Sequence, residues 1–166
     1  TAEGLLAGIS LDTKNFAFKT GVRTFEAASY LKKSGADTIE VKKLFNSDIK
    51  DFITKAEIIQ NAKVINNNIC LAYTKTETDN INIVIAQAAD ELLNIKEVEA
   101  SFVLARKDDR VFISARSLGN INVHVLMENL GGGGHRDMAG AQLDTSLEKA
   151  YEMVKDTIQT YIKEEE

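Results

Sequence analysis

The chain contains no proline, and four of its ten glycines stand in one run, Gly131–Gly134. Proline breaks and proline-rich linkers are therefore absent, so glycines and changes of hydrophobic period must mark the boundaries between elements. Up to about residue 62 the apolar residues recur at helical spacing, and beyond it short β-rich runs alternate with helices. The pattern predicts a helical first part followed by the order β-α-β-β-α-β-α.

The element boundaries follow from capping residues and from apolar periodicity. Helices are predicted over residues 1–9, 24–34, 37–45, 47–62, 79–93, 121–130 and from 147 onward. Strands are predicted over 64–65, 69–73, 97–105, 110–116 and 138–143. We expect an α/β fold with a mixed sheet of about four to five strands flanked by helices. The predicted division places a helical part in residues 1–62 and the α/β part in residues 63–166.

Composition excludes several classes of protein. Hydrophobic residues make up 44% and charged residues 27% of the 166 residues, a balance typical of globular proteins rather than disordered ones. The net charge of −5 excludes a globally basic nucleic-acid binder. The single cysteine, Cys70, excludes a disulfide framework and is expected to be an inert core residue. No apolar run approaches the ~20 residues that cross a bilayer, so a cytoplasmic chain is expected.

The strongest local signal for a ligand site is the glycine run followed by His135. Glycines leave no side chain to block a ligand, and successive backbone N–H groups in such a loop can bind an anion. A histidine at its end adds a directional donor or acceptor. The alternative is a flexible connector between helix and strand with an incidental histidine. Four glycines exceed what a helix C-terminus needs, which favours the ligand site.

A second signal lies at the end of the strand over 110–116. Ser114 and Arg116 are two residues apart, so they face the same side of a strand. The planar fork of an arginine suits phosphate. The alternative for Arg116 is an ordinary surface arginine, but strand ends and glycine loops often converge at one edge of an α/β sheet.

Asp12 is a third candidate, because it is a carboxylate between apolar segments. It is either a helix cap or a metal ligand, and no neighbouring cluster of Asp and His completes a metal site. Neither of the two histidines, His124 and His135, can be paired from sequence with an acid and a nucleophile, so nothing indicates a Ser-His-Asp triad.

These motifs together resemble the DHH family of phosphoesterases. Gly131–His135 after a helix, with Ser114–Ser117 on the strand before it, is similar to the DHH-associated domain. Gly8–Phe16 is similar to the fourth metal motif of the DHH catalytic domain. Three further stretches, residues 23–31, 35–37 and 118–123, resemble the membrane-anchored cyclic-di-AMP phosphodiesterases of Gram-positive bacteria.

The resemblance implies a function, a cofactor and a set of site residues. The implied reaction is hydrolysis of cyclic-di-AMP to the linear dinucleotide by a two-metal mechanism, usually with Mn²⁺. Asp12 would be one metal ligand. The substrate would be held by Ser114, Arg116, Gly131, Gly132, Gly133, Gly134 and His135.

The family's other metal ligands, including the Asp-His-His that names it, have no counterpart in this sequence. One carboxylate cannot hold two divalent ions. We therefore expect residues 1–62 to be a remnant of the catalytic domain and a linker. We also expect the chain to act together with a DHH domain that lies outside this sequence. Little or no hydrolase activity is expected from the chain alone. The residues after the histidine, Arg136–Gly140, also depart from the Ala-Ala pair expected there.

Several alternatives stay open at this point. The chain could belong to a hydrolase of short oligoribonucleotides or of pAp, or could be a non-catalytic nucleotide- or RNA-binding module. A structural or dimer-forming domain is the fourth interpretation, and the sequence leaves a homodimer open.

Overall fold

A computed structural model describes residues 1–165, which form two compact units, Thr1–Ser47 and a second unit that begins at Asp48. The first unit holds three helices, α1 (Ala2–Asp12), α2 (Val22–Lys33) and α3 (Thr38–Lys43). Leu6, Leu31, Ala36 and Val41 form its small core. Asp37 caps the N-terminus of α3, because its Oδ1 accepts from the Ile39 N–H at 2.7 Å.

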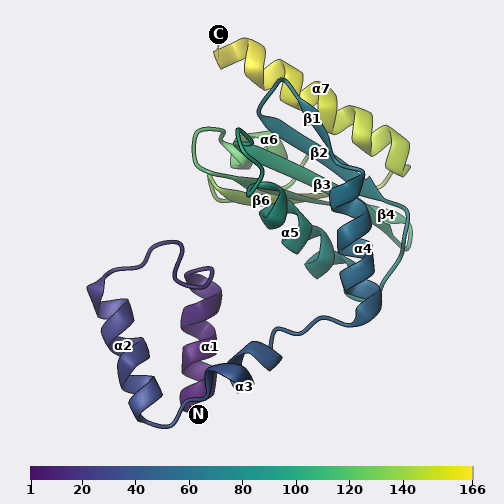
Figure 1. Ribbon diagram of the computed structural model, residues 1–166. Coiled ribbons are helices and arrows are strands. Elements are labelled where there is room, and N and C mark those ends of the chain that lie inside the picture. Colours follow the sequence, from purple (N-terminus) through teal and green to yellow (C-terminus); the bar gives the residue numbers. More distant parts are fainter. Residues whose placement is uncertain (166) are drawn as a thin grey trace. The chain divides into compact units, whose positions relative to one another are not determined.

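The second unit contains the sheet and the helices α4 to α7 (Figure 1). In chain order its elements are α4 (Ile49–Gln60), β1 (Lys63–Ile65), β2 (Ile69–Thr74), α5 (Ile81–Leu92), β3 (Ala100–Lys107), β4 (Arg110–Ser117), α6 (Val123–Glu128), β5 (Gly133–Gly134), β6 (Met138–Leu143) and α7 (Leu147–Glu165). Helix α4 belongs to the second unit, although the sequence predicted it as part of residues 1–62. Its Ile58 is fully buried in the cluster under α5.

The sheet has six strands in the order β1-β2-β3-β4-β6-β5. Strands β2 and β3 are parallel and joined through α5, and the other neighbours are antiparallel. The predicted mixed sheet flanked by helices is confirmed, with slightly more strands than expected. The additional strand is β5, whose two residues are too short to leave a periodic pattern.

The predicted start of the third strand at residue 97 is wrong. Glu97 has a φ of 71°, and the Val98 N–H donates to the Ile95 carbonyl in a turn. The strand therefore begins at Ala100, where Ala100 pairs with Ser117 of β4. The hairpin predicted after it is confirmed, since Lys107 and Arg110 close a two-residue loop.

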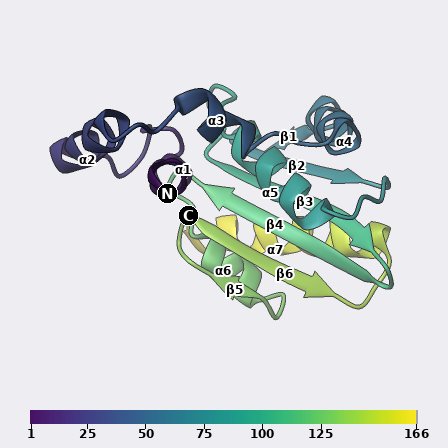
Figure 2. The same ribbon diagram turned by 90° about the horizontal axis from the view of Figure 1, so that it is seen from below.

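Helices cover both sides of the sheet, α4 and α5 on one side and α6 and α7 on the other (Figure 2). Alternate residues of β3 pack on opposite sides of the sheet. Phe102 packs in the cluster under α6 and α7, and Val103 packs in the cluster under α5. Cys70 is fully buried on the α5 side, as predicted. On this side β6 is exposed at Met138 and Gln142, so the far edge of the sheet is open. No helix among residues 1–165 is long and apolar enough to cross a bilayer.

Candidate ligand-binding face of the sheet

The strand register brings Arg116 and His135 into one row across three strands. Arg116 of β4 pairs with Met138 of β6. Met138 in turn closes the β5–β6 hairpin with His135, whose N–H donates to the Met138 carbonyl at 2.6 Å and whose carbonyl accepts from the Met138 N–H at 3.3 Å. Directly opposed residues share a side of an antiparallel sheet. From this pairing we expect the two side chains on the same side of the sheet, about 10 Å apart at two strand spacings.

A second row, next to the first, carries almost no side chains. It consists of Ser114, Gly140 and Gly133 in register on β4, β6 and β5. A third row begins with Phe112 opposite Gln142. We call this side of β4, β6 and β5 the open face. It consists of the first row, with Arg116, Met138 and His135, and of the second and third rows. The three strands thus bring together residues that lie up to 30 positions apart in the sequence.

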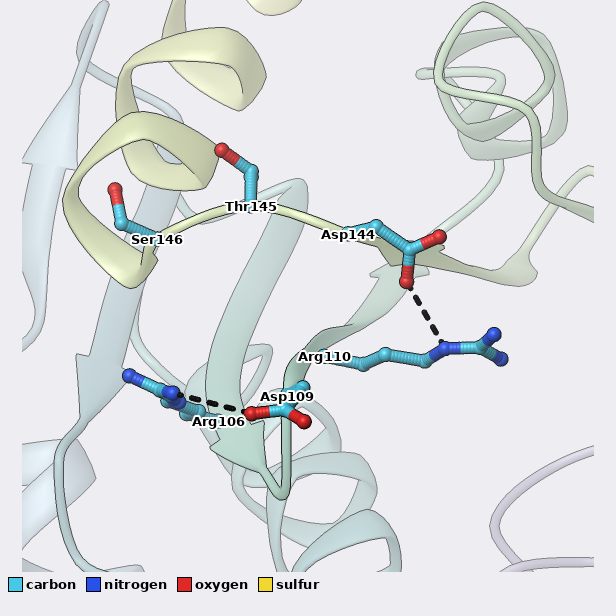
Figure 3. Close-up of a pocket in the computed structure, with 6 residues that line it drawn as sticks. All are labelled: Arg106, Asp109, Arg110, Asp144, Thr145 and Ser146. Carbon is cyan, nitrogen blue, oxygen red and sulfur yellow. Dashed lines mark ion pairs between the residues drawn. The ribbon is translucent and has the colours of Figure 1, made fainter.

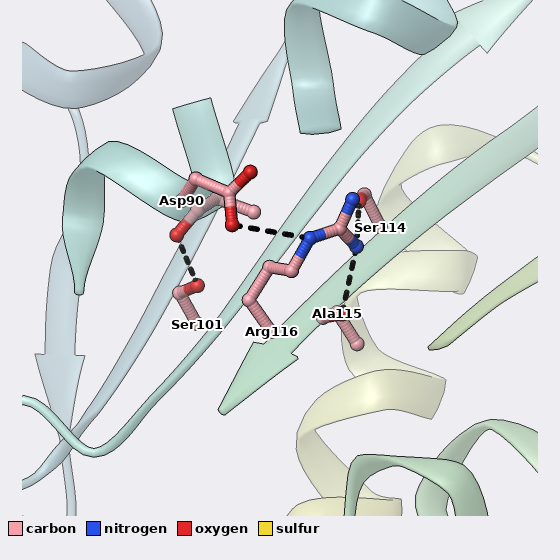
Figure 4. A network of polar contacts seen from close by, with 6 residues as sticks. Asp90, Ser101, Ser114, Ala115 and Arg116 are labelled. Carbon is pink, nitrogen blue, oxygen red and sulfur yellow. Dashed lines mark hydrogen bonds and ion pairs between the residues drawn. The ribbon is translucent and has the colours of Figure 1, made fainter. Parts of the chain in front are cut away.

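Arg116 is not the ordinary surface arginine of the alternative interpretation. Its side chain is only 11% exposed, and Nε lies 3.3 Å from Oδ1 of Asp90 on α5 (Figure 4). The Nη1 group donates to Oγ of Ser114 and to the Ala115 carbonyl, both at 3.0 Å. Nε has no hydrogen-bond partner among the described residues, so its contact with Asp90 is an ion pair without hydrogen-bond geometry. The guanidinium is held in place from three directions at the margin of the open face.

The glycine run is not a ring of free backbone donors. The N–H groups of Gly131 and Gly132 donate to the carbonyls of Glu128 and Met127 at the end of α6, at 2.9 and 2.8 Å. Gly131, with a φ of 78°, is the left-handed residue that ends the helix. A ligand at this edge therefore meets an uncovered surface and the His135 side chain rather than a nest of amides.

Two of the four glycines are required by close contact with β6. A Cβ on Gly132 would lie 2.1 Å from the Gly140 carbonyl oxygen, and one on Gly134 would lie 2.4 Å from that of Met138. A Cβ on Gly133 would meet nothing within 4 Å, and its φ is compatible with other residues. Packing thus explains Gly132 and Gly134, whereas Gly133 needs another explanation.

The turn that carries His135 is tied to the end of β4. The Ser117 N–H donates to the Asp137 carbonyl at 2.9 Å, and the Val123 N–H to that of Arg136 at 3.1 Å. Arg136 Nε donates to the Gly119 carbonyl at 2.9 Å. Three hydrogen bonds therefore fix the two-residue loop, so the exposed His135 is held on a rigid turn.

The open face continues into a hollow of about 400 Å³ beyond Gly140. Phe112 and Gln142 supply its side chains, and backbone at Gly131, Gly132 and Gly140 lines the remainder together with Ile113 and Ala141. No charged side chain lines this hollow. Its neutral lining contrasts with the Arg116–His135 row.

A larger pocket of about 660 Å³ lies at the other end of β4, beside the β3–β4 turn and the start of α7 (Figure 3). Its two arginines already have acidic partners. Arg110 Nε lies 2.9 Å from Oδ1 of Asp144, and Arg106 Nη2 lies 3.7 Å from Oδ1 of Asp109. Arg116 of the open face likewise has an acidic partner, Asp90, so charge pairing alone does not distinguish this pocket from the open face.

Asp12 is the last residue of α1 and is exposed, in the first unit. It does not cap the start of a helix, where Thr1 accepts a hydrogen bond from the Gly4 N–H instead. Across residues 1–165 no three His, Cys, Asp or Glu side chains lie close enough together to hold a metal ion. The described residues by themselves do not fit a two-metal centre.

Sequence reasoning missed Phe112 and Gln142 of this face, and Asp90 of α5, which contacts Arg116. Asp90 precedes Arg116 by 26 positions, and no local pattern links the two. Phe112 and Gln142 could have been found from the alternation of β4 and β6, because they have the same parity as Arg116 and Met138 in their strands.

Comparison with known proteins identifies the family. The family model of the DHHA1 domain matches residues 66–164. Cyclic-di-AMP phosphodiesterase GdpP of Bacillus subtilis is 46% identical over 166 residues, which cover 98% of this chain and 25% of that protein. Cyclic-di-AMP phosphodiesterase PdeA of Listeria monocytogenes is 42% identical over 166 residues, covering 99% of this chain and 25% of that protein.

The chain therefore spans about a quarter of the length of these curated relatives. An exopolyphosphatase-related protein from Bacteroides fragilis shares the fold, with a TM-score of 0.85 at 22% identity over 96% of this chain and 50% of that one. The match of the domain over most of the α/β unit agrees with the resemblance found in the sequence. The chain belongs to the DHHA1 domain family.

Proposed function

We propose that this chain is the substrate-holding part of a metal-dependent phosphodiesterase that hydrolyses cyclic-di-AMP to the linear dinucleotide. The observation that carries the proposal is the row formed by Arg116 and His135 beside the glycine surface of the open face. Relatives of this chain are named cyclic-di-AMP phosphodiesterases, which supports the choice of substrate.

The row suits a phosphodiester in charge and in shape. Arg116 is permanently cationic and is already oriented by Ser114 and Asp90, so little side-chain entropy is lost when an anion binds near it. His135 is exposed on a fixed turn, where a ring nitrogen is available to a ligand. Gly140 and Gly133 leave the surface between them free for the ligand backbone.

We further propose that the metal ions, Mn²⁺ by resemblance, are held mainly by a DHH domain outside this chain, with Asp12 as one ligand. Bound metals would supply the activated water for hydrolysis. The residues of the open face would bind and orient the dinucleotide, which is a role distinct from the chemical step.

Calorimetric titration of the chain with cyclic-di-AMP, its linear product, AMP and pAp tests the proposal, first without metal and then with Mn²⁺. We expect metal-independent binding that His135→Ala weakens at least tenfold. His124→Ala is the matched control, because His124 lies on α6 and outside the open face, with its Nε2 3.8 Å from Oε2 of Glu128. Preference for the linear product or for pAp would instead favour a hydrolase of short oligoribonucleotides or pAp. Absence of binding to a folded chain would overturn the proposal.

A further inference from the structure

The hollow beside Gly140 has the chemistry of a site for a neutral planar ring. It is a depression of about 400 Å³ that is open to solvent on one side. Phe112 supplies an aromatic surface, and Gln142 supplies one amide with both a donor and an acceptor. No other side chain in its lining carries a polar group, so the amide alone can give direction to a bound ring.

The hollow stands at a fixed distance from the charged row. Met138 and Gln142 are four positions apart in β6, which is about 14 Å along an extended strand. Gly140 lies midway and adds no side chain. The open face thus has an end with Arg116 and a neutral aromatic end joined by a bare stretch of backbone, so a dinucleotide with a phosphate at one end would place a base at the other.

We propose that Gln142 is the residue that selects adenine, with Phe112 as the surface on which the base rests. This inference rests on the proposed function, since it assigns the base of the same dinucleotide to the hollow. A glutamine amide is complementary to the adenine edge, where its oxygen accepts from N6 and its nitrogen donates to N7. Guanine presents two acceptors on that edge, O6 and N7, and leaves the glutamine oxygen facing another oxygen.

The structure also predicts how the selectivity can be reversed. An arginine offers two donors and matches guanine O6 and N7. Position 142 is exposed, and its neighbour across the sheet is Phe112, so a longer side chain meets no buried group. Gln142→Arg should therefore shift preference from adenine toward guanine without disturbing the fold.

The test is calorimetric titration of the chain with cyclic-di-AMP and cyclic-di-GMP for wild type, Gln142→Ala and Gln142→Arg. Gln159→Arg, at an exposed position of α7 on the other side of the sheet, is the matched control for the added charge. We expect wild type to prefer cyclic-di-AMP by tenfold or more. Gln142→Ala should bring the ratio of the two affinities near unity, and Gln142→Arg should invert it, while Gln159→Arg leaves it unchanged.

The outcomes separate the two proposals. If wild type binds cyclic-di-AMP and His135→Ala abolishes binding, but neither change at 142 alters the affinity ratio, the assignment of Gln142 is wrong and the proposed function stands. If folded wild type binds neither dinucleotide, the proposed function fails and the assignment of Gln142 fails with it. A thermal melt of each variant checks that the fold is retained.

Discussion

At the scale of single residues, the glycine run separates into positions with different roles. Gly132 and Gly134 let β5 approach the backbone of β6, and Gly131 ends α6 in a left-handed conformation. Gly133 has none of these constraints and lies in the bare row of the open face. The sequence predicted one ligand loop of four equivalent glycines, because spacing alone cannot show which of them face a neighbouring strand.

The first prediction compares two glycine-to-alanine changes. Gly132→Ala should lower the free energy of unfolding by about 1–3 kcal/mol, because the added methyl group overlaps backbone atoms of β6. Gly133→Ala should leave it within about 1 kcal/mol of wild type. Its methyl group should nevertheless weaken binding of cyclic-di-AMP. Urea unfolding and calorimetry measure both effects, and equal loss of stability in the two variants would contradict this division of the run.

A second residue-scale prediction concerns alkaline pH. Burial raises the pKa of the Cys70 thiol above its ordinary 9.0, and burial followed by the charge of Glu152 raises the pKa of Tyr151 above 10.0. The unfolded chain releases these protons at lower pH than the folded chain, so the folded state binds more protons between the two pKa values. Stability must therefore fall as pH rises through and beyond about 9.

Thermal unfolding between pH 7 and 11 measures this effect. Cys70→Ala removes one of the two groups and should make the decline above pH 9 shallower than in wild type. The folded thiol should also resist modification at pH 7.5, because little thiolate forms and none of the side chain is exposed. Rapid labelling of native Cys70 would contradict the burial described.

At the scale of elements, Arg116 joins helix α5 to strand β4. Its partner Asp90 is near the end of α5, and Ser101 of the neighbouring strand donates to the Ala89 carbonyl at 2.6 Å (Figure 4). These two contacts tie the last turn of α5 to adjacent strands. Arg116, which the proposed function places beside the ligand, is therefore also part of the packing between helix and sheet.

Asp90→Asn should lower the free energy of unfolding by about 1–2 kcal/mol, because it leaves the charge of a nearly buried arginine without its counterion. The expected loss of stability is smaller than for a fully buried pair, because the Asp90 side chain is 36% exposed. Asp109→Asn, which breaks an exposed pair at the β3–β4 turn, should cost less than about 0.5 kcal/mol. Chemical denaturation compares the two, and a larger loss for Asp109→Asn would argue against the role given to Asp90.

Most elements could be predicted from the sequence, because their signals are local. Strand β6 is predicted at its observed bounds, and α7 begins at Leu147 after Ser146, whose Oγ accepts from the Lys149 N–H at 3.2 Å. Contacts over long separations could not be predicted. The burial of Arg116 depends on Asp90, and the placement of His135 beside Arg116 depends on β6 lying between β4 and β5.

At the scale of the whole molecule, the proposed function assigns substrate holding to this chain and most of the metal binding to a domain outside it. The described residues hold no cluster that could bind a metal, and the relatives are about four times as long as the matched region. We predict that the chain with Mn²⁺ releases no linear dinucleotide from cyclic-di-AMP over hours, although it binds the substrate. Chromatography of the reaction mixture checks this, and turnover that survives further purification would contradict the division of roles.

The central claim is that a dinucleotide lies on the open face, across β4, β6 and β5. Amide chemical-shift mapping of the ¹⁵N-labelled chain during titration with cyclic-di-AMP tests it most directly. The account predicts that the largest shifts fall at Ser114, Arg116, Gly133, His135 and Gln142. Shifts confined instead to the β3–β4 turn and the start of α7, around Arg106 and Ser146, would place the ligand in the other pocket and contradict the account.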